Sequence, residues 1–112
     1  MLGSRVETGL ARAGYDVRVV DDLASFSAAL EGRTPVVVIL DIHAGVEAAD
    51  VVGASAARGA PVLAFGRHTE PALLRAARRA GCQAVVPRSE IVESLPELVA
   101  KVRAAGVPAA GN

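Results

Sequence analysis

The chain is poor in aromatic side chains, which make up 3% of its residues and include no tryptophan. Hydrophobic residues nevertheless account for 52% of the sequence. Any core must therefore be assembled from valine, leucine, isoleucine and alanine. A chain of 112 residues is long enough to bury one such core. We expect one domain over residues 1–105, followed by a flexible tail over residues 106–112.

The chain also has no excess of charge, because 12 basic residues balance 12 acidic ones. Non-specific binding to nucleic acid or to a membrane surface needs a positive field, so neither partner is expected. No apolar run approaches the roughly 20 residues that a membrane span requires. The first ten residues lack the basic and then apolar pattern of a signal peptide. These absences favour a cytoplasmic location.

Cysteine occurs once, at Cys82, so the chain cannot form an internal disulfide, as is usual for a reducing compartment. Since no histidine and asparagine pattern accompanies it, we interpret Cys82 as a small core residue and not as a nucleophile. No cysteine and histidine cluster has the spacing of a zinc site. No glycine-rich loop follows a strand in the manner of a dinucleotide site.

The hydrophobic pattern alternates between the helical period and the strand period along the whole chain. Apolar residues at helical spacing predict helices over residues 4–14, 21–32, 46–59, 69–81 and 89–106. Alternating or continuous β-branched runs predict strands over residues 15–20, 35–40, 60–65 and 83–87. Such alternation predicts an open, doubly wound α/β domain with four parallel strands and helices on both faces.

Capping residues support these boundaries. Asp21 or Asp22 can accept a hydrogen bond at the start of the second helix, and Thr69 can do so for the fourth. Gly81 is a natural terminator for the fourth helix. Pro96 is expected in a first turn, so the main body of the last helix should begin near it.

Candidate functional residues follow the strands, because open α/β sheets carry their sites at the carboxyl ends of the strands. Asp41 directly follows the most apolar run, "VVVIL". The other residues at or just past strand ends are Asp21, Asp22, Gly66 and Arg88.

The order of three segments, "VVVILDI", "PVLAFG" and "LLRAARRAGCQAVVPRS", resembles the receiver domain of two-component response regulators, which has a flavodoxin-like fold. The resemblance runs from Ser4 to about Ala105 and lacks the first strand. It implies that Asp41 accepts a phosphoryl group from a histidine kinase with the help of Mg²⁺. It also implies that the positions of Gly66 and Arg88 contact the phosphoryl oxygens.

The chain departs from the receiver pattern at the residues that support Asp41. The acidic pair of the first strand is absent, Gly66 replaces a hydroxyl residue, and Arg88 replaces a lysine of different reach and hydration. The loop "DIHAG" lacks the usual Pro-Gly. We therefore expect a degenerate receiver-like module that is not an enzyme and needs no cofactor. We expect it to be a monomer or homodimer and to work by contact with a signalling protein or with a second copy of the chain. The alternatives are a functional receiver phosphorylated on Asp41 and a small-ligand-binding flavodoxin-like domain.

The missing first strand leaves a gap between two predicted strands. We expect residues 16–20 to pair directly with residues 36–40, because unpaired buried backbone groups are costly. This closure would bring Asp21 and Asp22 toward Asp41, which makes the three carboxylates weak metal-ligand candidates. The alternative is a strand supplied by a second chain. We also expect Arg88 within ion-pair range of Asp41.

The histidines offer a second resemblance. "DIHAGV" is similar to the Asp-x-His-x-x-Gly segment of cobalamin-binding domains, in which the histidine ligates cobalt and the aspartate orients it. Gly45, however, comes one position early, and no Gly-Gly loop follows. We therefore expect His43 and His68 to be exposed loop or cap residues.

Overall fold

The computed structural model describes residues 2–106, and its centre is a sheet of three parallel strands. The strands are β1 (Val38–Asp41), β2 (Val62–Gly66) and β3 (Ala84–Pro87), and they lie in the order β1-β2-β3. In the part of the chain that is described, β1 pairs only with β2. All but Gly106 of the predicted tail lies outside the described residues.

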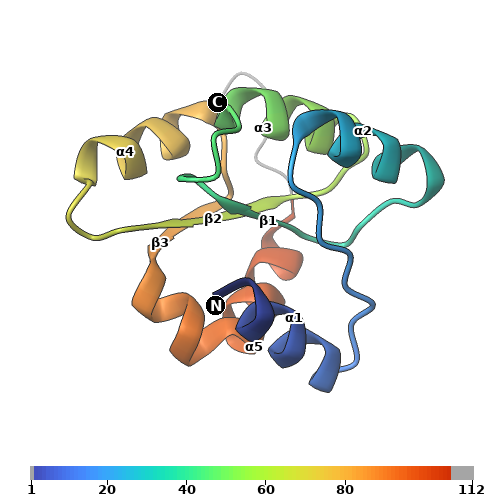
Figure 1. The fold of residues 1–112 in the computed structure, drawn as a ribbon, viewed down its shortest axis with the longest axis horizontal. Coiled ribbons are helices and arrows are strands. Elements are labelled where there is room, and N and C mark those ends of the chain that lie inside the picture. Colours follow the sequence, from blue (N-terminus) through green and yellow to red (C-terminus); the bar gives the residue numbers. More distant parts are fainter. Residues whose placement is uncertain (1, 107–112) are drawn as a thin grey trace.

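In the described range, five helices cover the two faces of this sheet (Figure 1). They are α1 (Leu2–Arg12), α2 (Leu23–Gly32), α3 (Ala48–Ala56), α4 (Pro71–Ala80) and α5 (Arg88–Ala105). Helices α2, α3 and α4 lie on one face, and α1 and α5 lie on the other. The predicted open flavodoxin-like architecture is therefore confirmed, with one strand fewer than expected. No helix in the described range is both long and apolar enough to cross a membrane.

The alternation of side chains along each strand divides the core in two. Val62 and Ala64 of β2 pack in the cluster under α2, α3 and α4. Leu63 and Phe65 pack in the cluster under α1 and α5. Every residue of β2 is buried, which explains why its sequence is continuously apolar and does not alternate.

The predicted strand over residues 15–20 is wrong. The segment is extended but makes no strand pairing, so neither closure against residues 36–40 nor a four-stranded sheet occurs. Tyr15 and Val17 pack instead against the cluster formed with α5, while Val19 is 59% exposed. The apolar alternation that predicted a strand is satisfied by contact with helices.

Tyr15 explains why this segment stays with the helices. Arg103 of α5 donates a hydrogen bond to the Tyr15 hydroxyl at 3.0 Å, and its guanidinium lies 5.5 Å from the ring centre. From this anchor the chain must travel from the layer of α1 to the layer of α2 on the opposite face (Figure 1). The contacts of Tyr15 with Arg103 therefore hold the start of this segment against α5.

The ends of the helices largely follow the predicted caps. The backbone N–H of Ser25 donates to Asp22 Oδ1 at 2.7 Å, so Asp22 is the N-cap of α2. Gly81 adopts the left-handed conformation, with φ of 110°, and ends α4 as predicted. Thr69 is not the cap of α4, because that helix begins at Pro71 after Glu70, whose side chain makes no capping bond.

The last helix starts earlier than the position of Pro96 suggested. Helix α5 begins at Arg88, directly after β3, and Ser94 interrupts it with non-helical angles. Pro96 then lies in the first turn after the interruption, where its missing N–H costs least. The main body near Pro96 is thus confirmed, and a short helical segment precedes it.

The capping role of Asp22 can be tested against its exposed neighbour. Asp22→Ala should lower the free energy of unfolding at pH 7 more than Asp21→Ala does. The hydrogen bond from Ser25 lowers the pKa of Asp22 below 3.8, so its contribution is present above that pH and is lost as the pH falls through the folded value. Urea unfolding from pH 7 to pH 2.5 should show the gap between the two variants shrinking with acid. An equal effect of both variants at pH 7 would contradict the assignment.

Candidate functional site

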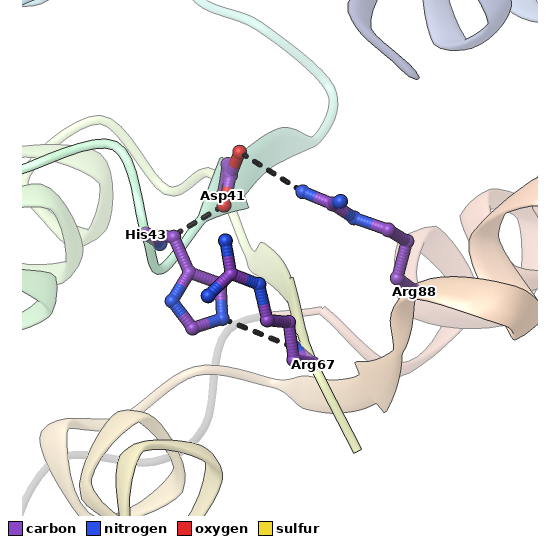
Figure 2. A network of polar contacts seen from close by, with 4 residues as sticks. All are labelled: Asp41, His43, Arg67 and Arg88. Atoms are coloured by element: carbon purple, nitrogen blue, oxygen red, sulfur yellow. Dashed lines mark hydrogen bonds and ion pairs between the residues drawn. The ribbon is translucent and has the colours of Figure 1, made fainter. Parts of the chain in front are cut away.

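Asp41 is the last residue of β1 (Figure 2). It lies opposite Phe65 in the parallel register. The backbone N–H of His43 donates to Asp41 Oδ1 at 2.9 Å. This bond from an aspartate to the N–H two residues later is an Asx turn, which reverses the chain directly after the strand. One carboxylate oxygen of Asp41 therefore shapes the loop, and its other oxygen faces away from this bond.

Arg88 supplies the nearest opposite charge. Its Nη2 lies 4.0 Å from Asp41 Oδ2, so the expected pairing is confirmed at the outer limit of an ion pair (Figure 2). Arg88 follows β3 and Asp41 ends β1, so the arginine reaches across the end of β2. The two side chains are 43% and 36% exposed, and such pairs contribute about 1 kcal/mol or less to stability. The contact places a positive charge beside Asp41 without neutralising it tightly.

Gly66 ends β2, between these two residues, and the space beside it is filled. A Cβ at this position would lie 2.6 Å from Ile42 Cγ1 and 3.2 Å from His43 Nε2. Real Cβ atoms essentially never lie under 3.0 Å from a neighbour, so a side chain at Gly66 requires the Ile42 side chain to move, and it also meets His43 at an unusually short distance. The site therefore lacks the hydroxyl implied by the resemblance, and it has room for one only if Ile42 moves.

His43 joins the loop after β1 to the loop after β2. The backbone N–H of Arg67 donates to His43 Nε2 at 3.0 Å (Figure 2). Because Nε2 accepts this bond, the ring proton of the neutral imidazole lies on Nδ1. His43 is half-buried, so the expectation that it is an exposed loop residue is wrong, whereas His68 is exposed. The sequence signal that was missed is the Asx turn. It places His43, the second residue after Asp41, next to the end of the neighbouring strand β2.

The carboxylates do not gather into a metal site. Asp22 caps α2, and both Asp21 and Asp22 are exposed. Within residues 2–106, no three side chains of histidine, cysteine, aspartate or glutamate are placed to hold a metal ion. Since Mg²⁺ prefers several hard oxygen ligands in near-octahedral geometry, the described residues do not fit the Mg²⁺ that the receiver resemblance implies.

Cys82 is buried in the short loop between α4 and β3, away from this edge. Burial raises the pKa of its thiol from 9.0 to about 11. Catalytic cysteines need the thiolate form, so this environment supports the interpretation of Cys82 as a core residue.

An open parallel sheet with an aspartate at the carboxyl end of one strand and a basic residue after the strand two positions away is an arrangement typical of a receiver-like α/β domain. The structure is similar to that of the signal receiver domain of a protein described as the response regulator NarL from Mycobacterium tuberculosis. The two are 27% identical, with a TM-score of 0.64, and the match covers 88% of this chain and 87% of that one. No protein-family model matches the chain, and no curated protein matches it at a significant level. The similarity confirms the receiver-like fold.

The filled space at Gly66 predicts a cost for restoring a hydroxyl there. Gly66→Ser should lower the free energy of unfolding by about 1–3 kcal/mol, because Ile42 must move out of a packed position. In the double variant Ile42→Ala/Gly66→Ser, the loss should be smaller than the sum of the two single losses. Gly53→Ser in α3 is the matched control, because a Cβ there meets nothing within 4 Å. Equal stability of Gly66→Ser and Gly53→Ser in urea unfolding would rule out the packing conflict.

The buried thiol should be slow to react in the folded protein. With a pKa of about 11, the thiolate fraction of Cys82 at pH 8 is about a hundredfold lower than for a thiol of pKa 9.0. The absorbance change with a disulfide reagent should therefore be slow in buffer and fast in 8 M urea, with no other cysteine contributing. Rapid reaction of the folded chain would show that Cys82 is accessible and ionised.

Proposed function

We propose that the chain is a regulatory module of the receiver type that works in the cytoplasm by contact with a protein partner, without phosphorylation of Asp41. It turns over no substrate and needs no cofactor. The structural likeness to a response-regulator receiver supports the signalling class. The observation that carries the finer proposal is the filled space at Gly66, where Ile42 and His43 occupy the volume that a side chain would need.

Phosphoryl transfer to an aspartate places several negative oxygens beside a carboxylate. Catalysis of such a step depends on positioned cations and hydrogen-bond donors around those oxygens. At this edge Asp41 has Arg88 at 4.0 Å, and the described residues contain no group of three or more side chains suited to a metal ion. One loosely placed arginine is weak support for a phosphoryl group, which favours a module that signals without it.

The edge formed by α4, β3 and α5 is the proposed contact surface, as in the receivers that the chain resembles. Both helices pack against β3 and flank it (Figure 1). Leu73 of α4 is 41% exposed and Val92 of α5 is 44% exposed. Large apolar side chains that remain accessible on two helices next to one edge strand are suited to a protein partner, which is a signalling protein or a second copy.

A working receiver is the second candidate, and one observation favours it. Asp41 lies at the carboxyl end of β1 with its side chain 36% exposed, so a phosphodonor could reach it, and Arg88 is close enough to respond to added charge. The two candidates share the fold and the contact surface, and they differ in whether Asp41 accepts a phosphoryl group.

Incubation with acetyl phosphate and Mg²⁺, followed by intact-mass measurement, separates the two candidates. We expect the mass of the wild-type chain to stay unchanged, because the space and the ligands around Asp41 do not support the transfer. Asp41→Asn and Asp50→Asn, an exposed aspartate on α3, are the paired controls. A stoichiometric adduct in the wild type and in Asp50→Asn that is absent from Asp41→Asn would establish the working receiver.

A further inference from the structure

One hydrogen bond between the loops that follow β1 and β2 depends on the charge of a histidine. The backbone N–H of Arg67 donates to His43 Nε2 at 3.0 Å (Figure 2). A neutral imidazole has one acceptor nitrogen, whereas the protonated ring has two donors and no acceptor. This bond can therefore exist only while His43 is uncharged.

The loop after β1, residues 42–47, has few polar attachments to β2. The Ile42 N–H donates to Phe65 O at 3.1 Å. Among the described residues, the bond to the His43 ring is the only hydrogen bond that joins a later residue of this loop to β2 or to the loop after it. His43 and Ile42 also fill the space beside Gly66. The ring therefore holds the loop over the end of β2.

The surroundings give a protonated His43 no close anionic partner. The charged or titratable side chains of the elements around the ring are Asp41 at the end of β1, Arg67 and His68 after β2, Arg88 at the start of α5, and Glu47 and Glu70 before α3 and α4. The ion pairs within residues 2–106 join Arg33 to Asp16 and Arg88 to Asp41, so none of these carboxylates lies within ion-pair distance of the ring.

Asp41 is the acid closest to His43 in the chain, and its carboxylate is already in use. One oxygen accepts the backbone N–H of His43, and the other faces Arg88. Figure 2 shows the side chains of Arg67 and Arg88 both directed toward this carboxylate. Protonation of His43 would thus replace a hydrogen bond by a contact between two N–H donors, in a region that already holds two arginines.

We propose that His43 is a pH-dependent switch that fixes the loop over residues 42–47 on β2 when neutral and releases it when protonated. The proton comes from solvent and binds the Nε2 lone pair, which breaks the bond from the Arg67 N–H. Arg67 is exposed, so its freed N–H can donate to water. The link is fully present above the pH range in which imidazole titrates, and it is lost as the pH falls through that range.

Release of the ring would change the candidate site itself. Ile42 would no longer be held against Gly66, and the turn at Asp41 would lose the support of the neighbouring loop. Histidine changes its charge within the pH range that cells experience, so this loop could respond to a physiological signal. The inference goes beyond the proposed function, because it needs neither a protein partner nor a phosphorylated Asp41.

The test is an NMR titration of the ¹³C,¹⁵N-labelled chain from pH 8 to pH 5. At pH 8 we expect a scalar coupling across the hydrogen bond between the Arg67 amide nitrogen and His43 Nε2, together with ring nitrogen shifts of the tautomer that is protonated on Nδ1. At pH 5 the coupling should be lost. The Arg67 amide and the Ile42 methyl resonances should move with the same midpoint as the His43 ring.

The same substitution at the two histidines supplies the matched control. His43→Gln has no imidazole to titrate, so the pH response of the Arg67 amide and of the Ile42 methyl should be absent. His68→Gln should leave that response unchanged, because His68 is exposed and adjoins Arg67 without accepting its N–H.

Two results would overturn the proposal. One is a wild-type chain in which the His43 ring titrates while the coupling persists or the Ile42 methyl does not move, a result that depends on no variant. The other is a pH response that survives in His43→Gln and is lost in His68→Gln. Neither result bears on the acetyl phosphate experiment, so the failure of this inference and the failure of the proposed function can be told apart.

Discussion

The burial of β2 on both faces and along both edges is the constraint on which the rest of the structure depends. Leu63 and Ala64 are 0% exposed, and they point to opposite layers of helices. A strand in this position must be apolar throughout, so the polar groups of the domain are displaced to the ends of the strands. Asp41, Arg67 and Arg88 meet at the carboxyl edge for that reason, with β2 supplying only Gly66 between them.

Gly66, the buried last residue of β2, extends this constraint to the candidate site. Since a buried strand end leaves a narrow space, the loop after β1 can lie over it with the side chains of Ile42 and His43. The Asx turn at Asp41 sets the direction of that loop, and the Arg67 N–H completes it by donating to His43. One oxygen of Asp41 thus accepts the hydrogen bond that shapes the loop, and the other faces Arg88.

Local patterns were sufficient to predict most of the fold. The Asp22 cap, the left-handed Gly81 and the apolar runs of β1 and β2 depend on neighbours in the sequence, and each was predicted correctly. The strand predicted over residues 15–20 was wrong. The alternating apolar side chains of this segment are accommodated by contact with α5 and not by strand pairing. Contacts such as the one between Arg103 and Tyr15 join residues that are far apart in the chain.

The same distinction applies to the candidate site. The proximity of Asp41 and Arg88 follows from the convergence of parallel strand ends, so topology alone predicted it. The filled space at Gly66 and the bridging role of His43 depend on how one loop packs on another strand. No spacing in the sequence encodes that packing directly.

The single partner of β1 has a consequence for the dynamics of the sheet. Val38 and Ile42 donate their amide protons toward β2, at 2.9 Å to Pro61 O and at 3.1 Å to Phe65 O. The strand period of two directs the N–H groups of Ile39 and Asp41 the other way, toward an edge on which the described residues place no strand. Hydrogen exchange in β1 should therefore alternate along the strand. The amides of Ile39 and Asp41 on the unpaired edge should exchange faster than those that are hydrogen-bonded to β2.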